Sequence, residues 1–264
     1  MVKIGIIGIG NMGLAILKGL LHLYGKEEII FTDVNQERCA AVSEETGVAY
    51  VRSNAECANQ AKYVILAVKP QYFDGVLKNI CNITTEKNVI ISIAPGITIG
   101  QLKEKLGIEK RVVRAMPNTP ALLGEGMTGV CYNDADFDEE ERKTIEEIFQ
   151  SFGKMRKVEE RQMSAVVCVS GSSPAYVYMF IEALADSAVK YGLPRDAAYE
   201  MAAQAVYGSA KMVLETGEHP AALKDKVCSP GGTTIAGVSA LEEFGFRNAV
   251  IKAGDACFVK SENI

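Results

Sequence analysis

Short apolar runs alternate with helix-type patterns through the first 160 residues of the chain. Such runs favour buried strands, and apolar positions three or four apart favour amphipathic helices. The runs predict strands at residues 2–8, 28–32, 63–68, 88–93, 112–116 and 128–132. The clearest helical patterns cover residues 13–24, 35–46 and 136–153. Because strands alternate with helices, we predict an α/β domain with right-handed βαβ units and a mostly parallel sheet over residues 1–160.

The pattern changes after about residue 160, where strand runs disappear and Ala-rich helical stretches replace them. These stretches cover residues 163–191, 194–215 and 233 to the C-terminus, and Pro174 should kink or divide the first. We therefore predict an all-α domain over residues 161–264. A helical region of about 100 residues buries its apolar surface poorly when alone, so we expect it to pack against a second subunit. The alternative is that it packs only on the first domain.

One uncharged stretch, residues 162–181, has about the length of a membrane-spanning helix. Ser164 and four consecutive residues, Ser170, Gly171, Ser172 and Ser173, precede Pro174 within it, so its mean apolarity is low. We interpret it as a buried helix of a soluble protein and expect no membrane partner. The N-terminus has one lysine before an apolar run cut by glycines, which is not the pattern of a signal peptide, so we expect a cytoplasmic protein.

The amino-acid composition argues against several kinds of partner and site. The net charge of −5 argues against a nucleic-acid partner bound through bulk charge. The only histidines, His22 and His219, provide little material for a multi-histidine metal site or a histidine relay, and we predict no metal. The 7 cysteines form no CxxC pair, a pattern typical of free thiols in a reducing compartment.

A glycine motif directly follows the first predicted strand and opens the first helix. Its residues are Gly8, Ile9, Gly10, Asn11, Met12 and Gly13. In this pattern the first glycine permits a tight turn, the second lets the backbone approach a pyrophosphate, and the third allows close helix–strand packing. The free N–H groups and the helix dipole then bind the anion. The motif therefore predicts a Rossmann-type dinucleotide-binding domain.

Asp33 follows the second predicted strand, where the adenosine ribose of a dinucleotide lies. A carboxylate here accepts from the ribose 2′-hydroxyl and repels a 2′-phosphate, which favours NADH. Alternatively, Asp33 or Asn35 caps the following helix, and Arg38, one turn further on, could bind a phosphate. We therefore expect NADPH or NADH as the cofactor.

Two further loops follow strands and should face the cofactor. One contains Ala67, Val68, Lys69 and Pro70, and the other contains Ala94. Small residues and a proline in each suit a flat ring lying against the backbone. Lys69 at this place could act in catalysis or could only bind the cofactor.

Six segments of the chain closely resemble the pyrroline-5-carboxylate reductase family. They are GIGNMG at 8–13, AVKP at 67–70, RAMPNTPA at 114–121, SGSSPAY at 170–176, GSAKMVLETGEHPAALKD at 208–225 and CSPGGTTIAGVSALEEFGFR at 228–247. They span nearly the whole chain in the expected order. The C-terminal Pro-Gly-Gly-Thr block is far more specific than the glycine motif.

The resemblance implies reduction of (S)-1-pyrroline-5-carboxylate to L-proline with NADPH or NADH, the last step of proline biosynthesis. It also implies a C-terminal helical domain that interlocks with another subunit and binds substrate, with homodimers that assemble further, in many cases into decamers. The resemblance assigns the cofactor to the glycine motif, Asp33, Asn54 and residues 67–70. This chain departs from many relatives at Asp33, where they have Ser, Thr or Arg, which leaves the coenzyme preference open.

The family's substrate loop maps to Ser229, Pro230, Gly231, Gly232, Thr233 and Thr234. The resemblance implies that Thr234 reaches the substrate ring nitrogen and that Glu160 lies near the substrate. Lys226, which stands where certain members have Asn, is a further candidate for binding the substrate carboxylate. A glycine loop that opens a helix offers serial N–H groups to a carboxylate. Glu160 could stabilise the iminium, pass a proton, or be a plain surface carboxylate.

Two other classes of protein fit parts of the pattern. A hydroxyacid dehydrogenase of similar plan needs an acid–base lysine in the helix after the first domain, and residues 164–182 contain none. A cofactor-sensing protein without turnover would not need the loop at 229–234. Serine nucleophile chemistry at residues 170–173 lacks a His–Asp pair to activate it.

Overall fold

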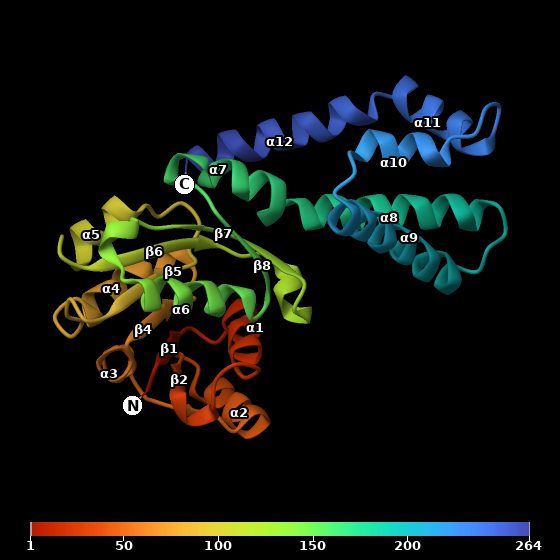
Figure 1. Cartoon of the computed structure of the whole chain (residues 1–264). Helices are drawn as coiled ribbons and strands as arrows, with labels where there is room; N and C mark the ends of the chain where they lie inside the picture. Colours follow the sequence, from red (N-terminus) through yellow and green to blue (C-terminus); the bar gives the residue numbers. More distant parts are fainter. Residues whose placement is uncertain (1, 264) are drawn as a thin grey trace. The chain divides into compact units, whose positions relative to one another are not determined.

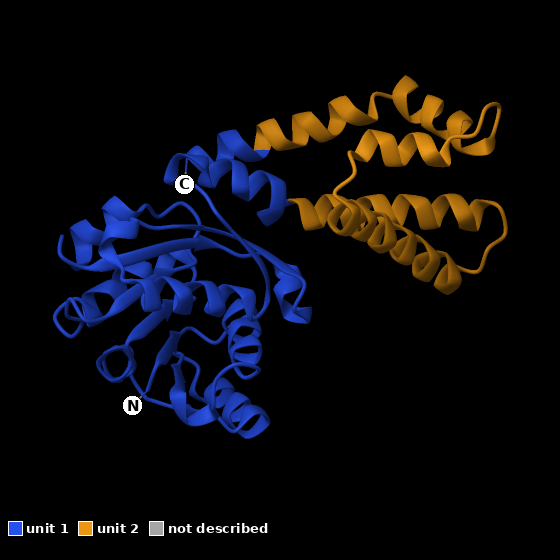
Figure 2. Ribbon diagram, viewed as in Figure 1, with its two compact units in different colours: residues 1–172, 257–264 blue, residues 173–256 orange. Residues whose placement is uncertain are grey.

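The computed structural model describes residues 2–263, which form two compact units (Figures 1 and 2). Unit 1 contains the described residues up to Ser172 and those from Cys257 onward, and unit 2 contains Ser173–Ala256. The two units divide between Ser172 and Ser173, later in the chain than the domain boundary that the sequence predicts at residue 160. The compact units do not test where the functional domains divide, so the boundary at residue 160 stays a prediction.

Unit 1 is built on a sheet of 8 strands in the order β3-β2-β1-β4-β5-β6-β7-β8. The strands are β1 Ile4–Ile7, β2 Ile29–Thr32, β3 Ala49–Tyr50, β4 Tyr63–Leu66, β5 Val89–Ser92, β6 Arg111–Met116, β7 Gly126–Cys131 and β8 Gly153–Lys157. Every neighbouring pair is parallel except β6 and β7, which are antiparallel. The chain moves outward in opposite directions from β1 and β4, and this is the point where open α/β sheets bind ligands.

Helices cover both faces of this sheet (Figure 1). They are α1 Asn11–Leu20, α2 Gln36–Thr46, α3 Asn54–Gln60, α4 Phe73–Ile80, α5 Ile99–Leu106, α6 Glu139–Gln150 and the short α7 Met163–Val166. Ile6 of β1 belongs to one apolar cluster with Leu17 of α1, whereas its neighbour Ile7 belongs to the other with Leu77 of α4. Because successive side chains of a strand point to opposite faces, the continuous apolar runs predicted as strands are buried on both sides. The predicted Rossmann-type fold is confirmed.

Two strands of the sheet, β3 and β8, have no apolar run to predict them. Both residues of β3 are exposed, and in β8 only Gly153 and Met155 are partly covered. Gly153 has φ of +147° and lies against Gly126 of β7, so it begins a strand instead of ending helix α6.

Unit 2 is entirely helical, as predicted. Its helices are α8 Ser173–Lys190, α9 Arg195–Thr216, α10 Pro220–Val227, α11 Thr233–Glu243 and α12 Phe246–Glu262, the last of which ends in unit 1. A π-helical segment, Val167–Gly171, precedes α8, so the predicted break near Pro174 occurs just before that proline. The sequence did not predict α10, and the helix expected from residue 233 to the C-terminus is interrupted at Gly245, with φ of +72°.

Little of unit 2 is buried within the chain. Its buried residues are the small side chains Ala185, Ala198 and Ala202. Among the described residues, one helical stretch, Glu160–Lys190, has the length and apolarity to cross a membrane, and little of it is buried in the single chain. A single copy of the chain leaves this stretch largely uncovered, so the interpretation of a buried helix stays a prediction that requires a second subunit.

Candidate functional site

The glycine motif lies at the carboxyl edge of the sheet, between β1 and α1. Gly8 has φ of +99°, and a Cβ there would lie 2.6 Å from the carbonyl oxygen of Ala67. A Cβ on Gly13 would overlap the carbonyl oxygen of Gly8. Two glycines of the motif are therefore required by backbone packing, and they bring the first loop against the loop that follows β4.

Gly10 differs from these two because no atom of residues 2–263 lies within 4 Å of its Cβ position. It is the N-cap residue of α1, and no side chain in the described part of the chain caps this helix. The first N–H groups of α1 therefore face open space without a side-chain acceptor. A pyrophosphate fits this place, because it needs close backbone approach and uncapped N–H donors.

Asp33 follows β2 and contacts the glycine motif directly. Its Oδ2 accepts a hydrogen bond from the Ile9 N–H at 2.8 Å, and its Oδ1 accepts from the Asn35 N–H at 2.9 Å. Asn35 is the N-cap of α2, with its side chain accepting from the Arg38 N–H at 3.0 Å. Of the two candidate caps, Asn35 caps the helix and Asp33 braces the glycine loop.

The other residues assigned to the cofactor lie on neighbouring loops of unit 1. Ala67 donates its N–H to Ile7 of β1 at 2.8 Å, and Lys69 is exposed just before Pro70. Ala94 is buried after β5, where its N–H donates to the Ser92 hydroxyl at 3.4 Å. Asn54 begins α3 and lines a cavity of about 730 Å³ together with Asp33, Val34 and Arg52. All predicted cofactor residues thus belong to unit 1.

The predicted substrate loop belongs to unit 2 and opens α11. Gly231 has φ of +68°, and the Gly232 N–H donates to the Ser229 carbonyl at 3.0 Å, which closes a tight turn. Gly232 is the N-cap of α11, again without a side-chain cap. Among the described residues no partner engages the hydroxyl of Thr234, which is half-buried, so this helix start and hydroxyl can both receive a polar ligand.

Lys226 lies near the end of α10, where its ammonium forms an ion pair with Glu218. Both side chains are at least one third exposed, so the pair is open to solvent.

Glu160 belongs to unit 1 and is held by two donors. Its Oε1 accepts from the Ile99 N–H at 2.7 Å and from Arg114 Nη1 at 3.2 Å. Ile99 is the first residue of α5, so the carboxylate stabilises the positive end of that helix. The carboxylate thereby connects the segment after β8 to α5 and to β6.

Two polar residues of the RAMPNTPA segment have positioning contacts that the motif itself does not specify. Arg114 is 12% exposed at the side chain and bonds Glu160. Asn118 is buried, donates to the Ser170 carbonyl at 3.0 Å and accepts from the Met127 N–H at 2.8 Å. In the sequence, these two roles could have been suspected because a polar residue stands inside, or just after, an apolar strand.

The buried thiols are poor nucleophiles. All 7 cysteines are free, and burial raises the pKa of Cys57 to about 12 and that of Cys131 to about 11. A raised pKa leaves a thiol protonated and poorly nucleophilic. Among residues 2–263, no group of three or more His, Cys, Asp and Glu side chains is arranged to hold a metal ion.

Two family models match the chain. The one described as pyrroline-5-carboxylate reductase dimerisation matches residues 160–264. The one described as NADP oxidoreductase, coenzyme F420-dependent, matches residues 3–96. The first therefore covers the helices of unit 2, and the second covers the glycine motif and its neighbouring loops.

Individual proteins match along nearly the whole chain. The chain is 49% identical over 265 residues to the pyrroline-5-carboxylate reductase of Escherichia coli strain K12, covering 99% of this chain and 98% of the relative. A pyrroline-5-carboxylate reductase structure from Coxiella burnetii is similar with a TM-score of 0.92 and 34% identity, covering 99% and 98% of the two chains. The Plasmodium falciparum pyrroline carboxylate reductase structure with NADP bound has a TM-score of 0.87 and 35% identity, covering 99% and 97%.

Proposed function

The chain belongs to the pyrroline-5-carboxylate reductase family, and from that premise we propose how its own residues carry out the reaction. The protein is an NAD(P)H-dependent oxidoreductase of proline biosynthesis that reduces pyrroline-5-carboxylate to proline. Family membership decides against the hydroxyacid dehydrogenase and the cofactor sensor that the sequence left open.

The cofactor would be held at the carboxyl edge of unit 1. The observation that carries this proposal is the uncapped start of α1 beside Gly10, where space and N–H donors suit a pyrophosphate. Asp33 fixes this loop, and residues 67–70 with Ala94 would line the remaining length of the dinucleotide. When bound, the nicotinamide supplies a hydride to the imine carbon.

The substrate carboxylate would be received by the loop of Ser229, Gly231, Gly232 and Thr233. The uncapped start of α11 supports this role, because serial N–H groups and the helix dipole stabilise an anion without an arginine. Lys226 adds a positive charge on the preceding helix, although its ion pair with Glu218 reduces that contribution.

We propose that the Thr234 hydroxyl bonds the ring nitrogen and so aligns the imine for hydride transfer. No residue among those described competes for this hydroxyl. For Glu160 we propose a fixed negative charge near the substrate, because Ile99 and Arg114 already engage its oxygen. A carboxylate held in this way stabilises positive charge on an iminium through position instead of proton transfer.

Self-association follows from the dimerisation domain. We propose a homodimer or a higher assembly in which unit 2 of one copy covers the exposed apolar faces of the other. This proposal accounts for the apolar stretch Glu160–Lys190 without a membrane. The net charge of −5 argues against a nucleic-acid partner bound through bulk charge, and because the 7 free cysteines suit a reducing compartment we propose a cytoplasmic enzyme.

The direct test is oxidation of NADPH or NADH by the purified protein when pyrroline-5-carboxylate is added. Thr234→Ala should lower kcat about a hundredfold, the effect of removing one well-placed hydrogen-bond donor, while the Kd of the coenzyme stays nearly unchanged. Ser239→Ala on the same helix is the control, because its hydroxyl bonds only the Ile235 carbonyl. Loss of coenzyme binding in Thr234→Ala would remove this residue from the substrate site, and cofactor binding without oxidation would overturn the proposed function.

A further inference from the structure

The turn that follows β2 holds the two backbone polar groups of Ile9 from two sides. Asp33 accepts from the Ile9 N–H at 2.8 Å, and Arg38 Nε donates to the Ile9 carbonyl oxygen at 2.5 Å. Ile9 is the second residue of the glycine motif, so both charged residues contact the loop that would receive the pyrophosphate. The conformation of this loop is therefore fixed by an acid and a base from the next βα turn.

The Asp33 carboxylate is already engaged. Each of its two oxygens accepts a backbone hydrogen bond, one from Ile9 and one from Asn35. Hydrogen bonds to both oxygens stabilise and partly offset the negative charge. Asp33 thus acts as a brace of the glycine loop, which weakens the expectation that it selects NADH through the ribose 2′-hydroxyl.

Arg38 is oriented by two contacts. Its N–H is capped by the Asn35 side chain at 3.0 Å in the first turn of α2, and its Nε is bound to Ile9. Because the guanidinium group is planar, fixing Nε also fixes the plane of the two terminal nitrogens. Within the described part of the chain those terminal nitrogens make no hydrogen bond or ion pair, and the residue is half-buried.

We propose that Arg38 receives the 2′-phosphate of NADPH and gives this enzyme its preference for NADPH over NADH, with Asp33 as a positioning residue for the glycine loop. The inference rests on the proposed function, because it requires a dinucleotide at this edge of the sheet. The end of β2 is where the adenosine ribose of such a ligand lies. A guanidinium with a fixed plane and two unengaged nitrogens matches a phosphate bidentately.

A second cation at this edge, Arg52, provides a matched control. It lines the cavity that also contains Asp33, but it is exposed and makes no hydrogen bond to the glycine motif. Arg52→Gln therefore removes the same charge from the same edge without removing a pre-oriented guanidinium.

The test is calorimetric binding of adenosine 2′,5′-bisphosphate and of adenosine 5′-monophosphate to the full-length protein. Arg38→Gln should weaken the bisphosphate about 10- to 100-fold, the value of charge-assisted bonds to one phosphate, and change the monophosphate less than about threefold. Arg38→Lys should lie between, because lysine keeps the charge and loses the planar fork. The kcat/KM ratio of NADPH to NADH should fall by the same factor as the bisphosphate affinity.

The ratio of the two affinities within one variant is independent of how much of the sample is folded. An equal loss of both nucleotides in Arg38→Gln would overturn the inference, since it would show only a loosened loop. A selective loss in Arg52→Gln would overturn it in favour of that arginine. Asp33→Asn should weaken both nucleotides alike; a tighter bisphosphate with a weaker monophosphate would restore Asp33 as the selector. If neither nucleotide binds the unaltered protein, the proposed cofactor site itself fails.

Discussion

The two units of the chain differ most in what they bury. In unit 1, every residue of β1, β2, β4 and β5 is buried, and two apolar clusters fill the space between the sheet and its helices. In unit 2, α10, α11 and α12 contain no buried residue, and the other two helices bury three alanines. Unit 1 therefore has a core of its own, whereas unit 2 presents apolar surface for a second copy to cover.

This difference in burial applies to the two proposed binding sites, one for the coenzyme in unit 1 and one for the substrate in unit 2. The proposed cofactor loops end strands that are buried on both faces, so their geometry is set within unit 1. The proposed substrate loop opens α11, a helix without a buried residue. We expect coenzyme binding to depend on the single chain and substrate turnover to depend on self-association.

The largest effect should follow from a charge in the apolar groove of unit 2. This groove, between α8, α11 and α12, has a volume of about 660 Å³ and is lined by Met179, Phe180, Leu184, Leu241 and Phe246 among others. Met179→Glu should weaken self-association at least about a hundredfold, because covering an unpaired carboxylate costs several kcal/mol. Sedimentation at several concentrations measures the association, and proline formation should fall with it.

The matched change in unit 1 is Ile108→Glu, at a side chain with 73% exposure outside any helix or strand. It should leave both association and activity unchanged. If Met179→Glu behaves in the same way, the groove is open to solvent in the assembled protein, and the contrast between the units does not reflect coverage by a second copy.

A smaller effect is expected for buried hydrogen bonds within unit 1. Asn118→Ala leaves the Met127 N–H and the Ser170 carbonyl without their partner, which should cost about 2–4 kcal/mol in the free energy of unfolding. Thr128→Val should be neutral or stabilise by up to about 1 kcal/mol, since the buried Thr128 hydroxyl has no partner among the described residues. Urea denaturation measures both, and an Asn118→Ala variant as stable as the unaltered protein would show that Asn118 contributes no hydrogen-bond stability.

The sequence predicted those structural features that depend on residues close together in the chain, and it missed those that depend on distant partners. The strands at β1, β4 and β5 were predictable because burial on both faces leaves a continuous apolar run. The glycine motif was predictable because the positive φ of Gly8 and the contact of Gly13 with the Gly8 carbonyl arise within one turn. The two-residue β3 and the charged β8 were not, since pairing with a neighbouring strand defines them.

The roles of charged residues were harder to predict, because they depend on distant partners. Asp33 has the position expected for a ribose contact, yet the N–H that it binds lies 24 residues earlier in the chain. Glu160 binds Ile99 across 61 residues. Nor does a pattern of apolar residues indicate whether the layer that covers them comes from the same chain or from a second copy, so the partner that covers residues 162–181 could not be read from the pattern alone.

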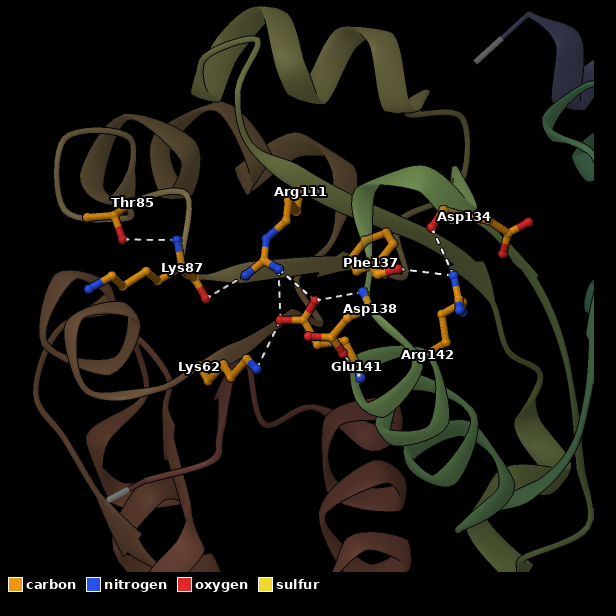
Figure 3. Close-up of polar contacts among 9 residues, drawn as sticks. All are labelled: Lys62, Thr85, Lys87, Arg111, Asp134, Phe137, Asp138, Glu141 and Arg142. Atoms are coloured by element: carbon orange, nitrogen blue, oxygen red, sulfur yellow. Dashed lines mark hydrogen bonds and ion pairs between the residues drawn. The ribbon is translucent and has the colours of Figure 1, made fainter.

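The smallest expected effect concerns an ion-pair cluster at the amino edge of the unit 1 sheet (Figure 3). Glu141 of α6 contacts Lys62 Nζ at 2.9 Å and Arg111 Nη1 at 2.7 Å. Burial opposes ionisation, but these two partners outweigh it and hold the pKa of Glu141 below its ordinary value of 4.5. A carboxyl group with a lowered pKa in the folded state stabilises that state above its unfolded pKa, and the contribution is lost as the pH falls through the folded pKa.

The Tm difference between the unaltered protein and Glu141→Gln should therefore be largest near neutral pH and should shrink below pH 4.5. Thermal melts from pH 7 to pH 3 measure it, with the exposed Glu146→Gln of the same helix as the control. A Tm difference that stays constant with pH would assign the effect to shape and hydrogen bonding, not to the charge of Glu141. Because the cluster lies wholly in unit 1, the pH dependence should also persist in Met179→Glu, where unit 2 has lost its second copy. Its disappearance there would show that the stability of unit 1 depends on self-association after all.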